Sequence, residues 1–178
     1  MARIVYELPF FDKSTKVEVQ GQEHRVFPLE ILVWVSLAPR GVREIPARTP
    51  KIPAILDPAF TDGFLIHQHH LRHFAGLLPE HLRRLNDALR THDRVIQLHA
   101  ANLWLHRNEP GQRDSFAEVS PFLLELPRGI GVSTDEAVYP RLPLLGARAL
   151  RTAGLKLFVD YERCRLSIRT RRRFWLFG

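Results

Sequence analysis

Proline and glycine divide this chain into short segments. The 178 residues include 13 prolines and 10 glycines, and β-branched and aromatic residues recur in the runs between them. Residues 16–19 alternate polar and apolar side chains, and residues 25–37 form a longer apolar run that contains Pro28. Proline lacks a backbone N–H, so within a sheet it is confined to edges, bulges and strand starts. The pattern predicts a mainly β domain built from short strands.

The remaining apolar runs predict further strands and a few short helices. We expect strands in residues 53–57, 94–108, 120–133, 142–145, 156–160 and 165–169. In residues 94–108 the alternation makes Val95, Leu98, Leu103 and Leu105 the expected inward positions. Leucine and phenylalanine at three- and four-residue spacings predict helices in residues 69–75 and 79–89, and a third short helix is expected in residues 147–152.

Length and composition narrow the class of protein. A chain of 178 residues fits one domain, and we expect a core over about residues 25–169 followed by a basic and aromatic tail at 170–178. No run approaches the roughly 20 apolar residues of a membrane span, and the N-terminus lacks a signal-peptide core, so we expect a cytoplasmic protein. The single cysteine, Cys164, excludes an internal disulfide and any metal site made of several cysteines.

The positive charge is concentrated near the C-terminus. The formal net charge is +7, from 26 basic and 19 acidic residues. Six of the arginines lie in the last sixteen residues, namely Arg163, Arg165, Arg169, Arg171, Arg172 and Arg173. Arginines beside the aromatic residues Phe174, Trp175 and Phe177 fit an anionic membrane surface or a nucleic acid, and they also fit a strand that closes a sheet and then frays. Trp34, Trp104 and Trp175 are dispersed, which favours packing over a stacking platform.

An aspartate stands at the end of a buried run. Residues 52–56 are apolar, Asp57 follows them, and Pro58 comes next. Asp-Pro at a strand end is common turn chemistry. A carboxylate delivered by a buried strand can equally serve as a general acid or base.

Two segments together resemble the retropepsin-like aspartic proteases. The first is AILDPAFTDGFLI, residues 54–66, and the second is LPLLGARALRTAGLKLFVDYERCRLSI, residues 142–168. In that family an apolar strand ends in Asp-Thr/Ser-Gly, and a later apolar-apolar-Gly element leads into a short helix and a closing hairpin. Here Leu144-Leu145-Gly146 is similar to the second element, and the following residues, with a turn at 161–163, to the helix and hairpin. The resemblance covers about residues 25–168.

The resemblance implies a fold, an assembly and a chemistry. It implies a single mainly β acid-protease domain with two or three short helices, acting as a homodimer on a peptide or protein substrate. Asp57 of each protomer would activate a water, with no metal and no organic cofactor. The residues that would form the active-site loop or contact substrate are Pro58, Ala59, Phe60, Asp62, Leu145 and Gly146. A flap hairpin is expected with its tip in residues 89–97, and the C-terminal tail would be a strand of the dimer interface.

The site departs from the family pattern at two positions. Pro58 replaces the threonine or serine whose hydroxyl braces the two loops of the dimer, and Ala59 replaces a glycine that allows close backbone approach. Two interpretations follow. The chain is either an active variant with a stiffer loop, or a catalytically inactive relative that serves as a binding or assembly module.

The histidines admit a metal interpretation. His69 and His73 are four residues apart on one face of the expected helix, and His70 is three from His73. No HExxH pattern accompanies them, and Gln68 stands where a carboxylate ligand would be wanted. This favours a solvated helix face over a metal site.

Overall fold

The computed structural model describes residues 3–90, 94–107, 121–134 and 141–170, and most of them lie in strands. The strands are β1 (Arg3–Pro9), β2 (Thr15–Val19), β3 (Gln22–Val26), β4 (Ile31–Pro39), β5 (Ile52–Asp57), β6 (Phe64–His67), β7 (Arg84–Arg90), β8 (Val95–His99), β9 (Ala101–Leu105), β10 (Phe122–Leu124), β11 (Ile130–Ser133), β12 (Leu144–Gly146), β13 (Leu155–Asp160) and β14 (Arg165–Thr170). The helices are α1 (Gln68–Ala75), the 3₁₀ turn η1 (Pro79–His81) and α2 (Ala147–Thr152). The prediction of a mainly β fold is confirmed.

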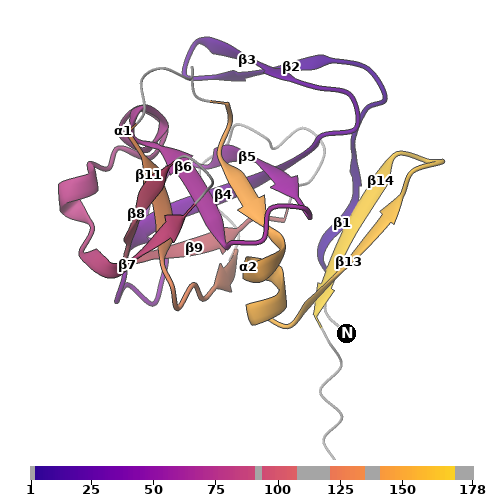
Figure 1. Ribbon diagram of the computed structural model, residues 1–178. Coiled ribbons are helices and arrows are strands. Elements are labelled where there is room, and N and C mark those ends of the chain that lie inside the picture. The colour runs from indigo at the N-terminus through magenta and orange to yellow at the C-terminus, as the bar shows by residue number, and fades with distance from the viewer. Residues whose placement is uncertain (1–2, 91–93, 108–120, 135–140, 171–178) are drawn as a thin grey trace, which may run out of the picture.

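The body of the molecule is one large sheet. Across the described residues its nine strands run in the order β10-β9-β4-β5-β12-β6-β11-β8-β7. Strand β12 pairs in parallel with β5, and β11 pairs in parallel with β6, whereas the other neighbours are antiparallel. Figure 1 shows α1 on one side of this body and α2 directly after β12. The two parallel pairs bring strand ends that are far apart in sequence to the same edge.

A second sheet joins the two ends of the described chain. Its order is β1-β14-β13, and Arg3 pairs with Arg169. The β13–β14 hairpin extends from the body, and β2 and β3 form a separate hairpin on another side (Figure 1). Val5 and Leu8 of β1 are buried in the common core, so the packed domain begins before residue 25.

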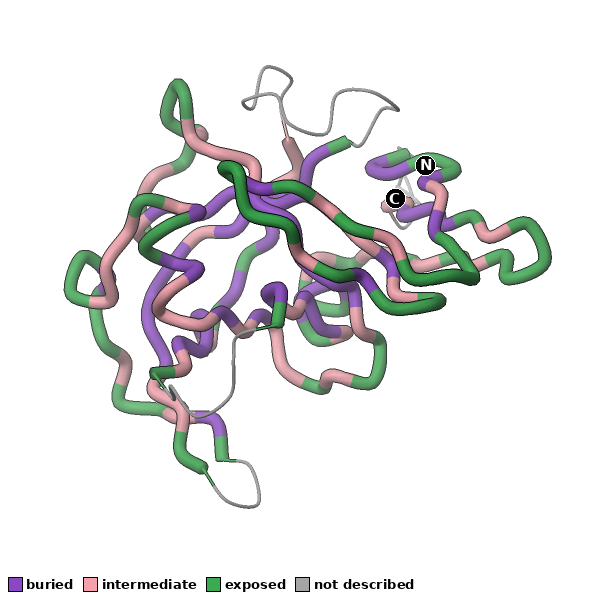
Figure 2. Tube along the Cα trace, turned by 90° about the horizontal axis from the view of Figure 1, so that it is seen from above, coloured by how far each residue is buried: buried purple, intermediate pink, exposed green. Residues whose placement is uncertain are grey.

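The core is built from buried side chains of the large sheet, of the β1-β14-β13 sheet and of helices α1 and α2. Strand β4 is buried along almost its whole length, because it is covered on both faces, and Figure 2 shows the buried trace concentrated in these strands. Trp34 and Trp104 are both 2% exposed, so the expectation that they pack in the core is confirmed. Leu98, Leu103 and Leu105 are buried as predicted.

The prediction that Val95 points inward is wrong. Its exposed fraction is 68%. Val95 pairs with Arg90 at the outer end of the β7–β8 hairpin. The predicted alternation of inward and outward side chains in β8 therefore holds at Leu98. It fails at Val95, because no neighbouring layer covers that end of the hairpin.

The predicted helix in residues 79–89 is also wrong. Only Pro79–His81 forms a 3₁₀ turn, and Arg84–Arg90 is strand β7, which pairs with β8. A four-residue separation, such as that of Leu85 and Leu89, places two side chains on the same face of a helix or of a strand, so the leucine spacing did not distinguish them. The other two helices are confirmed, and no helix within the described ranges is long and apolar enough to cross a membrane.

The proline in residues 25–37 divides that run into two strands. Strand β3 ends at Val26 and β4 begins at Ile31, with a turn between them. The Glu30 carboxylate accepts a 2.8 Å hydrogen bond from the Phe27 N–H, which closes the turn. Of the three positions that Pro28 allowed, an edge, a bulge or a strand start, the structure shows a late strand start.

Candidate functional site

Asp57 closes its own turn at the end of β5. The five preceding residues are buried, and Asp57 is half-buried. Its Oδ1 accepts a 2.9 Å hydrogen bond from the Ala59 N–H, and its carbonyl oxygen accepts one of 3.1 Å from the Phe60 N–H. Proline suits position 58, which is the second residue of this tight turn, because its fixed φ matches that position. The carboxylate is thus oriented by backbone, and Pro58 supplies no hydrogen bond to it.

The second sequence-predicted segment lies directly against this turn. In the parallel ladder Leu145 pairs with Leu56 and Gly146 with Asp57. The Gly146 N–H donates to the Gly63 carbonyl at 2.9 Å, and the Ala147 N–H donates to the Phe60 carbonyl at 3.0 Å. Residues almost ninety positions apart in the sequence are therefore bound into one backbone network.

Gly146 is required for this close approach. A Cβ built there would clash with the Asp62 carbonyl oxygen and would lie 2.5 Å from that of Phe60. Both are backbone atoms, which cannot move aside as the end of a side chain can. Gly146 is therefore a close-packing glycine, and the fully buried Leu145 anchors the strand beside it.

A cavity of about 750 Å³ opens beside the turn. Four segments line it: residues 61–64, the hairpin through Leu89 and Leu98, residues 126–129, and one side of α2. Asp57 is not among the lining residues. Pro58 lines a separate hollow of about 440 Å³, formed with the end of α2 and the start of β13. The two hollows share Ala147 and Arg151 of α2.

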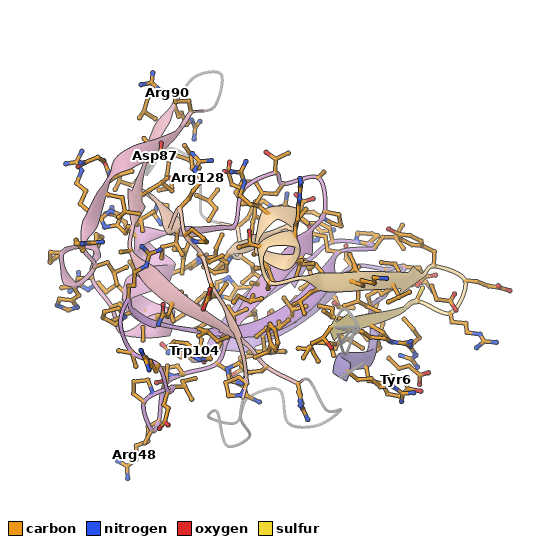
Figure 3. All side chains as sticks on the ribbon, turned by 90° about the horizontal axis from the view of Figure 1, so that it is seen from below. Tyr6, Arg48, Asp87, Arg90, Trp104 and Arg128 are labelled. Atoms are coloured by element: carbon orange, nitrogen blue, oxygen red, sulfur yellow. The ribbon has the colours of Figure 1, made fainter. Side chains whose placement is uncertain are left out.

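Charged side chains connect the segments around the cavity. The Asp62 carboxylate lies 3.3 Å from the Arg128 guanidinium and 3.8 Å from Nε of Arg148. Arg128 also reaches Asp87 on β7, at 2.8 Å, and Figure 3 shows these two side chains together. The hydrogen bond from Arg128, and then one from the Ala88 N–H, lowers the pKa of Asp87. Arg128 therefore links the Asp62 loop to the hairpin.

The residues expected to form the tip of a flap lie on the β7–β8 hairpin. The expected tip, residues 89–97, spans the end of β7 and the start of β8, and residues 91–93 lie outside the described residues. Leu89 on β7 and Leu98 on β8 both line the cavity. The hairpin therefore forms one wall of the cavity.

The histidines gather around α1. The His69 and His73 rings are 4.2 Å apart, and His70 stacks on Phe74 at 4.5 Å. His70 is 1% exposed, and burial, with a smaller effect of nearby histidines such as His24, lowers its pKa to about 3. In the part of the chain that the structure describes, no group of three or more His, Cys, Asp or Glu side chains could hold a metal ion. His70 is a neutral core residue.

A buried serine and histidine form a second polar pair. The Ser36 hydroxyl donates to the Pro50 carbonyl at 2.6 Å, and Ser36 Oγ lies 2.8 Å from Nε2 of His106. A hydroxyl has one proton to donate, so His106 must be the donor in the second bond. Ser36 is fully buried, which excludes it as a nucleophile for an external substrate.

Several charged residues of the cavity were not expected from the sequence. Arg128, Arg148 and Arg151 line the cavity but belong to no motif, and neither does Asp87, which pairs with Arg128 outside the cavity. Arg128 is 66 residues from Asp62 in the chain. Arg148 and Arg151 are three residues apart on a predicted helix that follows Gly146 directly. Residues three apart share a face of a helix, so this spacing was the one sequence feature that could have indicated two cations beside the Asp57 loop.

Most of the expected C-terminal tail lies outside the described residues. The described chain ends at Thr170, and residues 171–178, which include Trp175, lie outside the described residues. Its expected roles in dimer assembly or in binding nucleic acid or an anionic membrane therefore stay predictions.

Comparison with known proteins gives no match. No protein-family model, no curated protein and no solved structure matches the chain. A functional assignment therefore depends on the chain's own residues and their geometry.

Proposed function

We propose that the protein is an aspartic endopeptidase of the retropepsin-like class, active as a homodimer with one Asp57 from each protomer. The observation that carries the proposal is the pairing of Asp57 with Gly146 where β5 and β12 both end. It joins the two motifs on which the resemblance rests. Beside them lies a cavity walled by a hairpin, as a substrate groove under a flap requires.

The proposed chemistry needs two carboxylates in contact. Two such groups cannot both stay ionised, so they share one proton and titrate as a unit. The ionised one takes a proton from a water, whose oxygen attacks the peptide carbonyl carbon, while the protonated one gives its proton to the carbonyl oxygen. The tetrahedral intermediate then collapses. The carboxyl that took the proton from water gives it to the amide nitrogen, the C–N bond breaks and the amine leaves, and a hydroxyl of the intermediate returns its proton to the other carboxylate.

Residues of this chain would position the reacting carboxylate. The 2.9 Å hydrogen bond from the Ala59 N–H fixes the orientation of the Asp57 carboxylate. Gly146 holds the loop behind it, through the bond to Gly63. A peptide would lie along the cavity between the 126–129 segment and α2, with its scissile bond toward Asp57.

One observation favours a second candidate, a peptide-binding module without catalysis. Pro58 has neither a hydroxyl nor an N–H, so the brace between the two loops of a dimer is missing on both sides. The cavity and the hairpin do not depend on that brace. A chain with these features could still hold an extended peptide.

Cleavage of an unfolded protein separates the two candidates. The protease proposal predicts that the chain cuts reduced, unfolded casein best at acidic to mildly acidic pH, and that Asp57→Asn abolishes cutting. Asp12→Asn is the matched control, because Asp12 is exposed in a bend and its change is chemically the same. Cutting that survives Asp57→Asn sinks the assignment, and binding without cutting by the unaltered chain favours the binding module.

A further inference from the structure

Three arginines surround the cavity beside the Asp57 turn. Arg148 and Arg151 lie three residues apart on α2, and Arg128 stands across from them in the segment before β11. The side chains of Arg128 and Arg148 are 41% and 46% exposed, and Arg151 is exposed. All three guanidinium groups are therefore accessible to a ligand.

The three arginines differ in what they already bind. Arg128 holds Asp62 and Asp87, and Arg148 donates to the Thr61 carbonyl at 3.1 Å and lies near Asp62. The backbone carbonyl of Arg151 accepts a 3.0 Å hydrogen bond from the Gly154 N–H, but the Arg151 guanidinium has no hydrogen bond or ion pair with any residue that the structure describes. Among the described residues, these three guanidinium groups face the two carboxylates of Asp62 and Asp87, so one positive charge is left over, on Arg151.

The floor of the cavity is apolar. Phe64, Leu98, Leu126 and Leu89 line it, and each is at most 6% exposed. A ligand that fills the cavity therefore needs an apolar stem as well as a group that binds arginine. A doubly charged phosphate would exceed the single uncompensated positive charge, whereas a carboxylate matches it and accepts two hydrogen bonds from a guanidinium fork.

From this geometry we infer that the cavity is a recognition site for an acidic side chain of an extended peptide, with Arg151 as the residue that binds its carboxylate. The inference rests on the proposed function in taking a peptide as the ligand. A glutamate suits the site, because its methylene groups can lie on the leucine floor while its carboxylate reaches the arginine rim.

Peptide binding tests the inference without requiring catalysis. The full-length Asp57→Asn chain is titrated against two fluorescein-labelled, C-terminally amidated peptides, Ala-Phe-Leu-Glu-Leu-Phe-Ala and its Gln counterpart, with anisotropy as the readout. We expect the Glu peptide to bind about tenfold more tightly, as one charge-assisted hydrogen-bonded pair implies. The preference should decrease as salt is raised.

Two arginine variants locate the preference. Arg151→Gln in the same background should remove the preference for Glu, and Arg151→Lys should restore part of it. Arg48→Gln is the matched control and should leave the preference intact, because Arg48 is exposed and Figure 3 shows it far from Arg128. Arg151 is exposed, so neither change should unfold the chain, and a thermal melt followed by circular dichroism checks this.

Several results would overturn the inference. They are equal affinity for the two peptides, a preference that survives Arg151→Gln, or no binding of either peptide. A third peptide, with Gln and a free C-terminal carboxylate, should bind no better than the amidated Gln peptide, and binding as tight as that of the Glu peptide would assign the site to a chain terminus instead.

Cleavage of the same peptides by the unaltered chain distinguishes this inference from the proposed function. If the Glu preference in binding holds and neither peptide is cut, the endopeptidase proposal fails and the acidic site stands. If both peptides are cut at equal rates and bind equally, the acidic site fails and the endopeptidase stands.

Discussion

Gly146 pairs with Asp57 as the last step of the parallel ladder between β12 and β5. A methyl group at Gly146 would press on two backbone carbonyl oxygens, those of Asp62 and Phe60. We therefore expect Gly146→Ala to lower the free energy of unfolding by about 1–3 kcal/mol, because the loop must move away. Urea unfolding followed by fluorescence measures the change.

Gly63→Ala is the control for that prediction. Gly63 lies in the same loop, but the nearest atom to an added Cβ is Cδ2 of Leu126, at 3.1 Å, which belongs to a side chain that can rotate. We expect a loss below about 1 kcal/mol. Equal losses in the two variants would contradict a special role for the Gly146 contact.

The fold could be predicted for segments whose own residues determine their secondary structure. Strand β5 is a continuous apolar run because it is buried on both faces, and α2 follows a glycine and precedes another, so both were placed correctly from the sequence. The leucine spacing predicts a helix where β7 lies, because the feature that makes this segment a strand is its pairing with β8. Pairing of that kind depends on a neighbouring segment and leaves no mark in the spacing of leucines.

The ion pairs of Arg128 should restrict the hairpin. Arg128 bridges Asp62 on the loop and Asp87 on β7, and all three side chains are partly exposed. Arg128→Gln should therefore change global stability little, since exposed pairs are screened. It should nevertheless speed amide exchange in β7 several-fold, because the hairpin loses its link to the loop.

Hydrogen exchange followed by mass spectrometry measures that effect. Arg163→Gln provides the control, because Arg163 also pairs with an exposed aspartate, Asp160, but in the turn between β13 and β14. Exchange in β7 should be unaffected by it. Unchanged exchange in Arg128→Gln would show that Arg128 does not hold the hairpin.

His106 should make stability depend on pH. Burial, and then the charge of Lys51, lowers its pKa to about 4, whereas an unfolded histidine has the ordinary value of about 6.5. Between these values the unfolded chain binds a proton that the folded chain does not, so stability is complete above pH 6.5 and decreases as pH falls toward 4. From pH 7.5 to 5.0 this histidine accounts for a loss of about 2 kcal/mol.

Urea unfolding at both pH values tests the assignment. His106→Gln keeps a donor for the Ser36 hydroxyl but cannot titrate, so its stability should fall by about 2 kcal/mol less over that range. The pKa of His70 is also lowered, so His70 still contributes to the pH dependence of stability in this variant. His81→Gln, at an exposed histidine, is the control, and a slope in His106→Gln equal to that of the unaltered chain would contradict the prediction.

The candidate site could be found from sequence only in part. Asp57 and Gly146 belong to motifs whose spacing indicates a shared edge, and the structure pairs them. Arg128 and Asp87 come from segments with no motif, and they meet only because the β7–β8 hairpin folds beside the segment before β11. Their role depends on strand pairing, which the local sequence does not encode.

Placing the residues typical of retropepsin-like proteases after Asp57 should raise the proposed peptidase activity. Pro58→Thr combined with Ala59→Gly adds a hydroxyl while keeping the backbone N–H that bonds to the Asp57 carboxylate at 2.9 Å. We expect the rate of casein cleavage to rise about tenfold, as one added hydrogen bond across the dimer implies. The matched variant Pro58→Ala with Ala59→Gly removes the proline without adding a hydroxyl. An equal gain in that variant would assign the effect to loop flexibility.

Residues 171–178 should contribute to dimer formation. The described chain ends in β14, which pairs with β1 and β13 in a sheet that also carries the exposed aromatic residues Tyr6 and Phe158, at 46% and 45% exposure. A second chain would cover such apolar surface. Deleting residues 171–178 should therefore lower the dimer fraction measured by multi-angle light scattering. Replacing Arg171, Arg172 and Arg173 with glutamine should leave the dimer fraction unchanged, because the apolar residues of the tail remain. An unchanged dimer that no longer binds RNA or anionic liposomes would instead make the tail a binding segment.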